Sequence, residues 1–115
     1  MIHFDYNVSD LRPDDRTLLA AKAAVLKEYP ALRIRITGHC DERGSDQYNI
    51  GLGMRRAAAA RDFLAVAGVD PARIDVSSLG RERPLDLTHD EAAWARNRRD
   101  EFEIVAGGQT LGTPR

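Results

Sequence analysis

The sequence has few of the features that several large classes of protein depend on. Its single cysteine, Cys40, excludes an internal disulfide and a zinc site built from several thiolates. None of its apolar runs comes near the roughly 20 residues that a membrane-spanning helix needs. Its 17 basic and 18 acidic residues give a net charge of −1, so a strongly basic face would require an equally acidic one elsewhere. We therefore expect no nucleic-acid partner.

The residues that are present suffice for one globular domain. The 115 residues are 43% hydrophobic and 30% charged, which suits a chain that buries a single core. No signal peptide is visible, because Met1 is followed at once by strand-like residues. We expect either a cytosolic protein or a piece of a longer precursor, and composition does not separate the two.

Strand and helix signals alternate along the chain. The clearest strand covers residues 32–37, where apolar and polar residues alternate. Pro13 suits the first position of a helix, and Pro30 ends that helix. Thr88 and Glu91 have the spacing of a capping box, which predicts the start of a short helix. We expect strands at residues 2–4, 32–37, 74–77 and around 102–104, and helices at 13–29, 46–67 and after 88.

The expected elements follow the order β-α-β-α-β-α-β. Each helix is amphipathic, and helices packed on one face of a sheet bury both apolar surfaces in two layers. The sequence therefore predicts an α+β fold, a two-layer α/β sandwich. The long helix should turn toward the sheet an apolar stripe formed by Tyr48, Leu52, Ala59, Phe63 and Val66.

Charged residues interrupt this pattern where the second strand meets the long helix. Arg56 lies one turn after Leu52, on or beside the apolar stripe, where a guanidinium needs an anionic partner. Asp41 lies in the polar loop at residues 38–45, just before the same helix, and Asn49 lies on the first turns of that helix. Arg98 adds a cation at the end of the third helix. We expect an anion, a cation and a polar amide to meet in one small region.

The residues alone leave two interpretations open. Asp41 and Arg56 can form a structural ion pair. Alternatively, they form a site for a zwitterion, in which Asp41 holds an ammonium group and Arg56 holds a carboxylate through a bidentate fork. A metal site is disfavoured, because His39, Cys40 and Asp41 are consecutive and consecutive strand residues point to opposite faces. An enzyme is also disfavoured, because the sequence has no nucleophile elbow and no phosphate-binding glycine loop.

The motifs around these residues resemble a known family. They are TGHCDERGS at residues 37–45, YN at 48–49, LG at 52–53 and RRAA at 55–58. This set resembles the signature of OmpA-like peptidoglycan-binding domains. FDY at 4–6, SDLRP at 9–13, GRERP at 80–84 and HDEAAWARNRR at 89–99 make the likeness closest to the peptidoglycan-associated lipoproteins (Pal). The likeness runs from residue 2 to residue 105.

The resemblance implies a fold and a binding site. It predicts a mixed four-stranded sheet within an OmpA-like domain at residues 1–106, followed by a flexible tail at 107–115. It implies non-covalent binding of the diaminopimelate residue of the peptidoglycan stem peptide, with no enzymatic activity, cofactor or metal. The residues it implies for the site are Asp41, Arg56, Asn49, Arg98, Phe4, Asp5 and His39.

The resemblance also implies a cellular setting. Similar proteins are anchored to the periplasmic face of the outer membrane by a lipidated N-terminal cysteine, and they work with TolB and other Tol proteins. That cysteine and the linker after it are absent here, so we expect Met1 to mark an expression start. The alternative function is that of a protein-interaction adaptor, which docks a periplasmic partner such as TolB and binds peptidoglycan only secondarily.

Overall fold

The structure is a computed structural model that describes residues 1–108. The order of its elements is the predicted β-α-β-α-β-α-β, with one addition, a short 3-10 helix at Pro71–Arg73. The strands are β1 (Ile2–His3), β2 (Arg33–His39), β3 (Ile74–Gly80) and β4 (Arg99–Ala106), and the helices are α1 (Pro13–Glu28), α2 (Asp46–Val66) and α3 (Glu91–Asn97).

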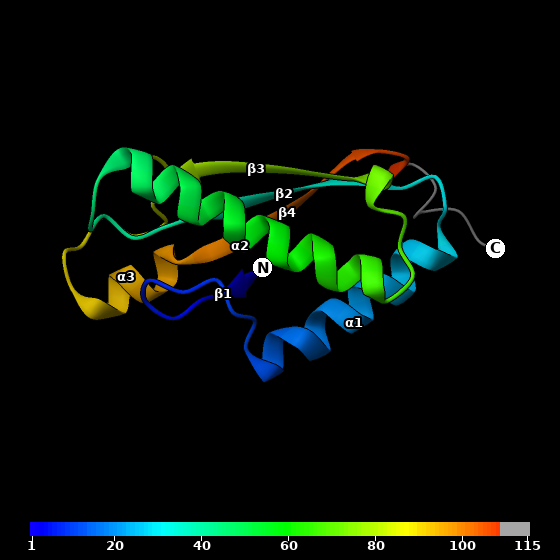
Figure 1. Cartoon of the computed structure of the whole chain (residues 1–115), viewed down its shortest axis with the longest axis horizontal. Coiled ribbons are helices and arrows are strands. Elements are labelled where there is room, and N and C mark those ends of the chain that lie inside the picture. Colours follow the sequence, from blue (N-terminus) through cyan, green and yellow to red (C-terminus); the bar gives the residue numbers. More distant parts are fainter. Residues whose placement is uncertain (109–115) are drawn as a thin grey trace.

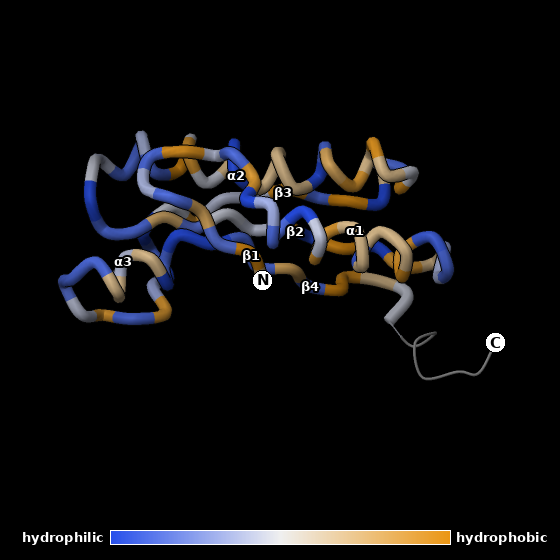
Figure 2. The backbone as a smooth tube through the Cα atoms, turned by 90° about the horizontal axis from the view of Figure 1, so that it is seen from below, coloured by the Kyte–Doolittle hydropathy of each residue, from blue (hydrophilic) through white to orange (hydrophobic). Residues whose placement is uncertain are grey.

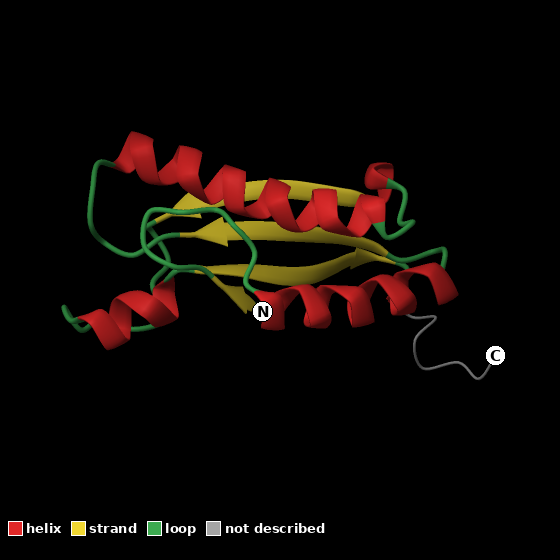
Figure 3. Ribbon diagram, turned by 60° about the horizontal axis from the view of Figure 1, so that its bottom comes forward, coloured by secondary structure: helices red, strands yellow, loops and turns green. Residues whose placement is uncertain are grey.

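The four strands form one mixed sheet in the order β1-β4-β2-β3. β2 runs parallel to β3 and antiparallel to β4, and β1 runs antiparallel to β4. Helices α1 and α2 lie on the same face of the sheet, and α3 lies at one end (Figures 1 and 3). The predicted α+β class, its two layers and the mixed four-stranded sheet are therefore confirmed.

The central strand β2 has the alternation that the sequence predicts. Ile34 and Ile36 point into the core beneath the helices, and Arg33 and Arg35 are exposed on the opposite face. On that face Arg35 forms an ion pair with Glu103 of β4 at 2.8 Å. One face of the sheet is therefore covered by helices, and the opposite face of β2 carries charged side chains.

The predicted apolar stripe of α2 is confirmed for Leu52, which is buried, and Phe63, which packs against the core. It is wrong for Tyr48 and Val66, which are 43% and 91% exposed. The helix lies so close to the sheet that a Cβ atom at Gly38 would be 1.8 Å from the carbonyl oxygen of Gly53. Small residues and one cation therefore lie beside two leucines on the buried face of the helix, and glycine and arginine give no hydrophobic signal. The buried residues of α2 are Asn49, Leu52, Gly53, Arg56, Ala57, Ala60 and Leu64.

Two further details concern the ends of elements. Gly68 has a φ of 106° just after α2, which is the left-handed conformation that glycine commonly adopts past the end of a helix. The predicted capping box of Thr88 and Glu91 is wrong, because the residue that caps α3 is Asp90, whose carboxylate accepts a hydrogen bond from the Ala93 backbone at 2.8 Å. An aspartate nearer the first turn takes the position that threonine was expected to fill.

The described part of the chain ends shortly after the last strand of the sheet. β4 ends at Ala106, and Gly107 follows with a φ of 79°. Of the predicted tail at 107–115, residues 109–115 lie outside the described residues, so its flexibility stays a prediction. Within residues 1–108, no helix has both the length and the apolar character needed to cross a membrane.

Candidate ligand-binding site

The loop between β2 and α2 carries Asp41 and is fixed at several points. The side chain of Ser45 accepts a backbone hydrogen bond at the start of α2. The Cys40 thiol donates to the carbonyl oxygen of Asn49 at 3.2 Å, and the Asn49 amide donates to the carbonyl oxygen of Arg43 at 2.8 Å. These contacts tie the loop to the first turn of the helix. The loop is predominantly hydrophilic (Figure 2).

Asp41 is buried and already satisfied by two arginines. Its carboxylate accepts hydrogen bonds from the backbone N–H of Arg43 at 3.0 Å and from the Arg43 guanidinium at 3.2 and 2.9 Å. It also accepts one from Arg98 at 3.3 Å. Burial raises the pKa of Asp41, but the hydrogen bonds from Arg43 and Arg98 outweigh burial and leave the pKa below its ordinary value. Among the ion pairs of residues 1–108, Asp41 therefore pairs with these arginines and not with Arg56.

Arg56 is fully buried and is held by uncharged groups. Its Nε donates to the carbonyl oxygen of Val8 at 2.9 Å, Nη1 to that of His39 at 3.1 Å and Nη2 to that of Asp5 at 3.0 Å. The guanidinium also lies 5.1 Å from the centre of the Phe4 ring. Burial lowers the pKa of Arg56 from its ordinary value. These partners are carbonyl dipoles and a ring face, which compensate a cation less than a carboxylate does.

Three other predicted residues meet at this place. Arg98 donates from Nε to the carbonyl oxygen of Phe4 at 2.9 Å and from Nη2 to Glu91 at 2.9 Å. Phe4 is buried and contributes its ring and its backbone. Asp5 contributes only its carbonyl oxygen, because its carboxylate is exposed and pairs with Arg12 at 2.6 Å.

His39 takes a different position from the one expected of a site residue. Its carbonyl oxygen faces Arg56, but its imidazole points to the other face of the sheet, where Nε2 lies 3.0 Å from Glu101. Burial and the nearby Arg99 guanidinium lower the pKa of His39 to about 4, so the imidazole is neutral at pH 7. His39 therefore contributes backbone rather than side-chain chemistry to the site.

Asp41 and Arg56 line one small cavity of about 40 Å³. Ligand pockets typically measure roughly 300–1,000 Å³, so this cavity admits a small group and not a whole amino-acid head. Its remaining lining comes from the N-terminal segment, the loop and α2: Tyr6, Asn7, Cys40, Arg43, Gly44, Tyr48, Asn49 and Leu52.

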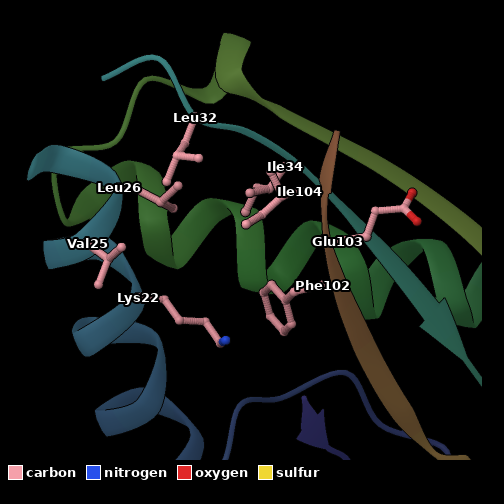
Figure 4. A pocket seen from close by; sticks show the side chains of 8 residues that line it. All are labelled: Lys22, Val25, Leu26, Leu32, Ile34, Phe102, Glu103 and Ile104. Atoms are coloured by element: carbon pink, nitrogen blue, oxygen red, sulfur yellow. The ribbon is translucent and has the colours of Figure 1, made fainter. Parts of the chain in front are cut away.

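A larger cavity of about 290 Å³ lies between α1 and β4 (Figure 4). The Lys22 ammonium lies 4.7 Å from the centre of the Phe102 ring, and Glu103 is already paired with Arg35. This cavity therefore offers apolar surface rather than converging charged groups. Its lining is Lys22, Val25, Leu26, Leu32, Ile34, Phe102, Glu103 and Ile104.

Residue-based reasoning missed Arg43 and the two aromatic rings around it. The Arg43 guanidinium lies 3.9 Å from the centre of the Tyr6 ring and 4.1 Å from that of Trp94. A signal was present, because an aspartate often accepts a hydrogen bond from the backbone two residues later and turns the chain back on itself. That turn brings the side chain of Arg43 over Asp41. The positions of the two rings depend on the tertiary fold and carry no local signal.

Together, the fold and these contacts define a small α+β domain with a buried cluster of charged side chains. Residues 1–108 gather no group of three His, Cys, Asp or Glu side chains that could hold a metal ion. Residues 3–98 match the model of the OmpA family. The chain belongs to the OmpA family.

Known relatives and structures agree with this assignment. The chain is 47% identical over 107 residues to a peptidoglycan-associated lipoprotein of Mesorhizobium japonicum, covering 93% of this chain and 64% of the relative. It is 44% identical over 101 residues to that of Pseudomonas aeruginosa, covering 88% and 60%. The crystal structure of the peptidoglycan-associated lipoprotein from Burkholderia pseudomallei is similar with a TM-score of 0.88 and 41% identity, covering 90% of this chain and 87% of that one. The chain thus spans less than two thirds of the length of the curated relatives it matches.

Proposed function

We propose that this domain binds peptidoglycan non-covalently by holding the zwitterionic end of a diaminopimelate residue. Asp41 receives the ammonium group and Arg56 receives the carboxylate. The observation that carries the proposal is the burial of Arg56, at 0% exposure, among backbone carbonyls and beside a cavity that also contains a buried carboxylate. A buried guanidinium without an ionised partner is costly, and a ligand carboxylate can supply that partner.

The hydrogen-bonding capacity of Arg56 supports this assignment. A guanidinium has five N–H groups, and those on Nε, Nη1 and Nη2 that bind Val8, His39 and Asp5 fix its plane. The remaining N–H groups can donate to a ligand carboxylate in a defined direction. Diaminopimelate differs from lysine by one carboxylate, so a lysine-type peptide would leave this capacity unused.

The names of the relatives support the choice of polymer. Proteins 47% and 44% identical to this chain are named peptidoglycan-associated lipoproteins. Because this chain spans only part of their length, we propose for the whole protein that a lipid anchor places the domain at the periplasmic face of the outer membrane. There the domain would tether that membrane to the cell wall and work with TolB and other Tol proteins.

The proposal is tested by calorimetric titration with diaminopimelate-type and lysine-type stem peptides and by sedimentation with purified sacculi. Asp41→Asn should weaken binding of the diaminopimelate peptide by about 2–5 kcal/mol, the range for breaking a close desolvated charge pair. Arg56→Lys should also weaken binding. This variant keeps the buried positive charge, whereas Arg56→Ala would remove both the charge and the hydrogen bonds to three backbone carbonyl oxygens. Asp62→Asn and Arg61→Lys, an exposed pair on α2, are the matched controls.

Unchanged affinity in both site variants, with cooperative unfolding retained, would refute the assignment of these residues. Release of soluble fragments from sacculi would instead point to a hydrolase. A non-covalent binder leaves the sacculi intact and dissociates when the peptide is added in excess.

An adaptor function has one observation in its favour. Leu85 and Leu87, in the loop between β3 and α3, are 53% and 78% exposed, and exposed apolar side chains often mark protein interfaces. If this were the main function, the domain would fail to sediment with pure sacculi until TolB or another protein partner was added. Replacing both leucines by serine would then abolish binding, whereas Asp41→Asn would not.

A further inference from the structure

Asp41 has no hydrogen-bonding capacity left for a ligand in its present state. A carboxylate has about four acceptor positions on its two oxygens. Here one oxygen accepts from the backbone and the Nε of Arg43, and the other accepts from Arg43 and Arg98. The neighbouring cavity measures only about 40 Å³. An ammonium group can therefore bind Asp41 only if one of these donors leaves.

The two arginines differ in how easily they can leave. The side chain of Arg98 is 5% exposed and also bonds the Phe4 carbonyl oxygen and Glu91. The side chain of Arg43 is 31% exposed. Beyond Asp41, its guanidinium contacts the faces of two rings and lies 3.8 Å from Glu91. Arg43 is therefore the donor that can move, because its guanidinium has fewer strong contacts and direct access to solvent.

The contacts of Arg43 imitate those that a bound amine would make. Its guanidinium is paired with Asp41 and lies between the rings of Tyr6 and Trp94, at 3.9 and 4.1 Å from their centres. A carboxylate combined with aromatic faces also suits an alkylammonium group. The Asn49 amide holds the carbonyl oxygen of Arg43, so the backbone of the loop can stay in place while the side chain moves.

From these contacts we infer that Arg43 is an internal substitute for the ligand cation, which any ligand has to displace from Asp41 by partner exchange. The inference rests on the proposed function. The ligand ammonium replaces the Arg43 guanidinium at Asp41, and this exchange alone brings little gain, because one cation is traded for another. A ligand that also carries a carboxylate gains the contact with Arg56 and offsets the exchange. Both kinds of ligand meet this cost equally, so Arg43 sets an affinity threshold that a zwitterionic end exceeds and a plain amine does not.

The test uses Arg43→Gln, which keeps the backbone hydrogen bond to Asp41 but removes the guanidinium. The control is Arg96→Gln, which removes an exposed arginine of α3 that pairs with Asp86 and changes the net charge equally. Diaminopimelate-type and lysine-type tripeptides are titrated by calorimetry. Affinity for both peptides should rise by about tenfold in Arg43→Gln, the equivalent of one charged contact, so that binding of the lysine-type peptide becomes measurable while the ratio of the two affinities stays the same. Arg96→Gln should match the wild type.

Trp94 gives a second measurement, which starts from the wild-type domain. It is the only tryptophan of the chain, and the Arg43 guanidinium lies on its ring. Saturation of the wild-type domain with the diaminopimelate-type peptide should change the Trp94 fluorescence. Arg43→Gln should show altered fluorescence without peptide and a much smaller change with it.

The outcomes separate this inference from the proposed function. If the wild type binds neither peptide by calorimetry, the proposed function fails and the inference fails with it. If the wild type binds the diaminopimelate-type peptide without any change in Trp94 fluorescence, the partner exchange is refuted while the proposed function stands. Equal weakening of both peptides in a folded Arg43→Gln domain would show that Arg43 is a ligand contact and would also refute the exchange.

Discussion

Asp100 is the most unfavourably placed ionisable group in the described part of the chain. It lies on β4 opposite Ile2 of β1 and Gly38 of β2, it is 0% exposed, and neither carboxyl oxygen has a hydrogen-bond partner within residues 1–108. Burial raises the pKa of Asp100 to about 8, against the opposing effect of the Arg56 cation. At pH 7 the folded protein therefore keeps this carboxyl protonated. We predict that Asp100→Asn, which is neutral at every pH, stabilises the fold.

The size of the effect follows from the two pKa values. In the unfolded chain Asp100 ionises at its ordinary pKa of 3.8, and in the folded state it ionises at about 8. Between these values the folded state holds a proton that the unfolded state has lost, so the free energy of unfolding falls as pH rises. The interval from 3.8 to pH 7, at about 1.36 kcal/mol per pH unit, corresponds to roughly 4 kcal/mol. This loss of stability is complete above the pKa of Asp100 in the folded state and absent below its pKa in the unfolded state.

The assay is chemical denaturation of the wild type and Asp100→Asn at intervals from pH 3.5 to pH 8.5. The difference between the two free energies of unfolding should be small at pH 3.5 and should grow by several kcal/mol by pH 7. Asp75→Asn, at an exposed carboxylate of β3, should stay parallel to the wild type. A difference between Asp100→Asn and the wild type that does not change across this range would show that Asp100 ionises normally in the folded protein. The explanation from burial would then be wrong.

Three other predictions use the same denaturation assay. Gly38→Ala should destabilise the fold by about 3 kcal/mol or more, because its Cβ would lie 1.8 Å from a backbone oxygen of α2. The control Gly51→Ala should be neutral or stabilising, because its Cβ would meet nothing closer than 3.5 Å. Asp90→Ala should cost about 1 kcal/mol through loss of the helix cap, and Asp90→Asn, which can still cap, should cost less. His39 has its folded pKa lowered to about 4 from 6.5, so its contribution is present above pH 6.5 and is lost as pH falls toward 4. His39→Gln should remove that part of the acid-induced loss.

The sequence was informative about the fold wherever burial is achieved by apolar side chains. Residues 32–37 show a period of two, and Ile34 and Ile36 are indeed buried in β2. It failed in part for α2, where the buried face contains Gly53, alanines and Arg56 beside its leucines. Close approach of a helix to a strand requires small residues, and hydropathy periodicity cannot register them. The larger apolar residues on neighbouring faces, such as Val66, then gave a misleading stripe.

The same limit explains what could be known about the site. Arg56 was detectable because a charged residue within an apolar pattern has to be explained, and Asp41 because it lies in a polar loop beside a helix start. Which arginine meets which carboxylate was not detectable. Arg98 and Arg99 are adjacent in sequence, yet Arg98 bonds Asp41 while Arg99 bonds Glu101 on the other face of the sheet.

That division arises where α3 ends and β4 begins, because Arg98 is the last residue before the strand and Arg99 is its first, and successive side chains there point to opposite faces. Predicting it requires the residue at which β4 begins, and strand ends are the least certain part of a sequence-based assignment. A shift of one residue would exchange the two arginines and leave Asp41 paired with the wrong one. The charged residues of the site can therefore be predicted from the sequence. Which arginine pairs with which carboxylate depends on the residue at which β4 begins.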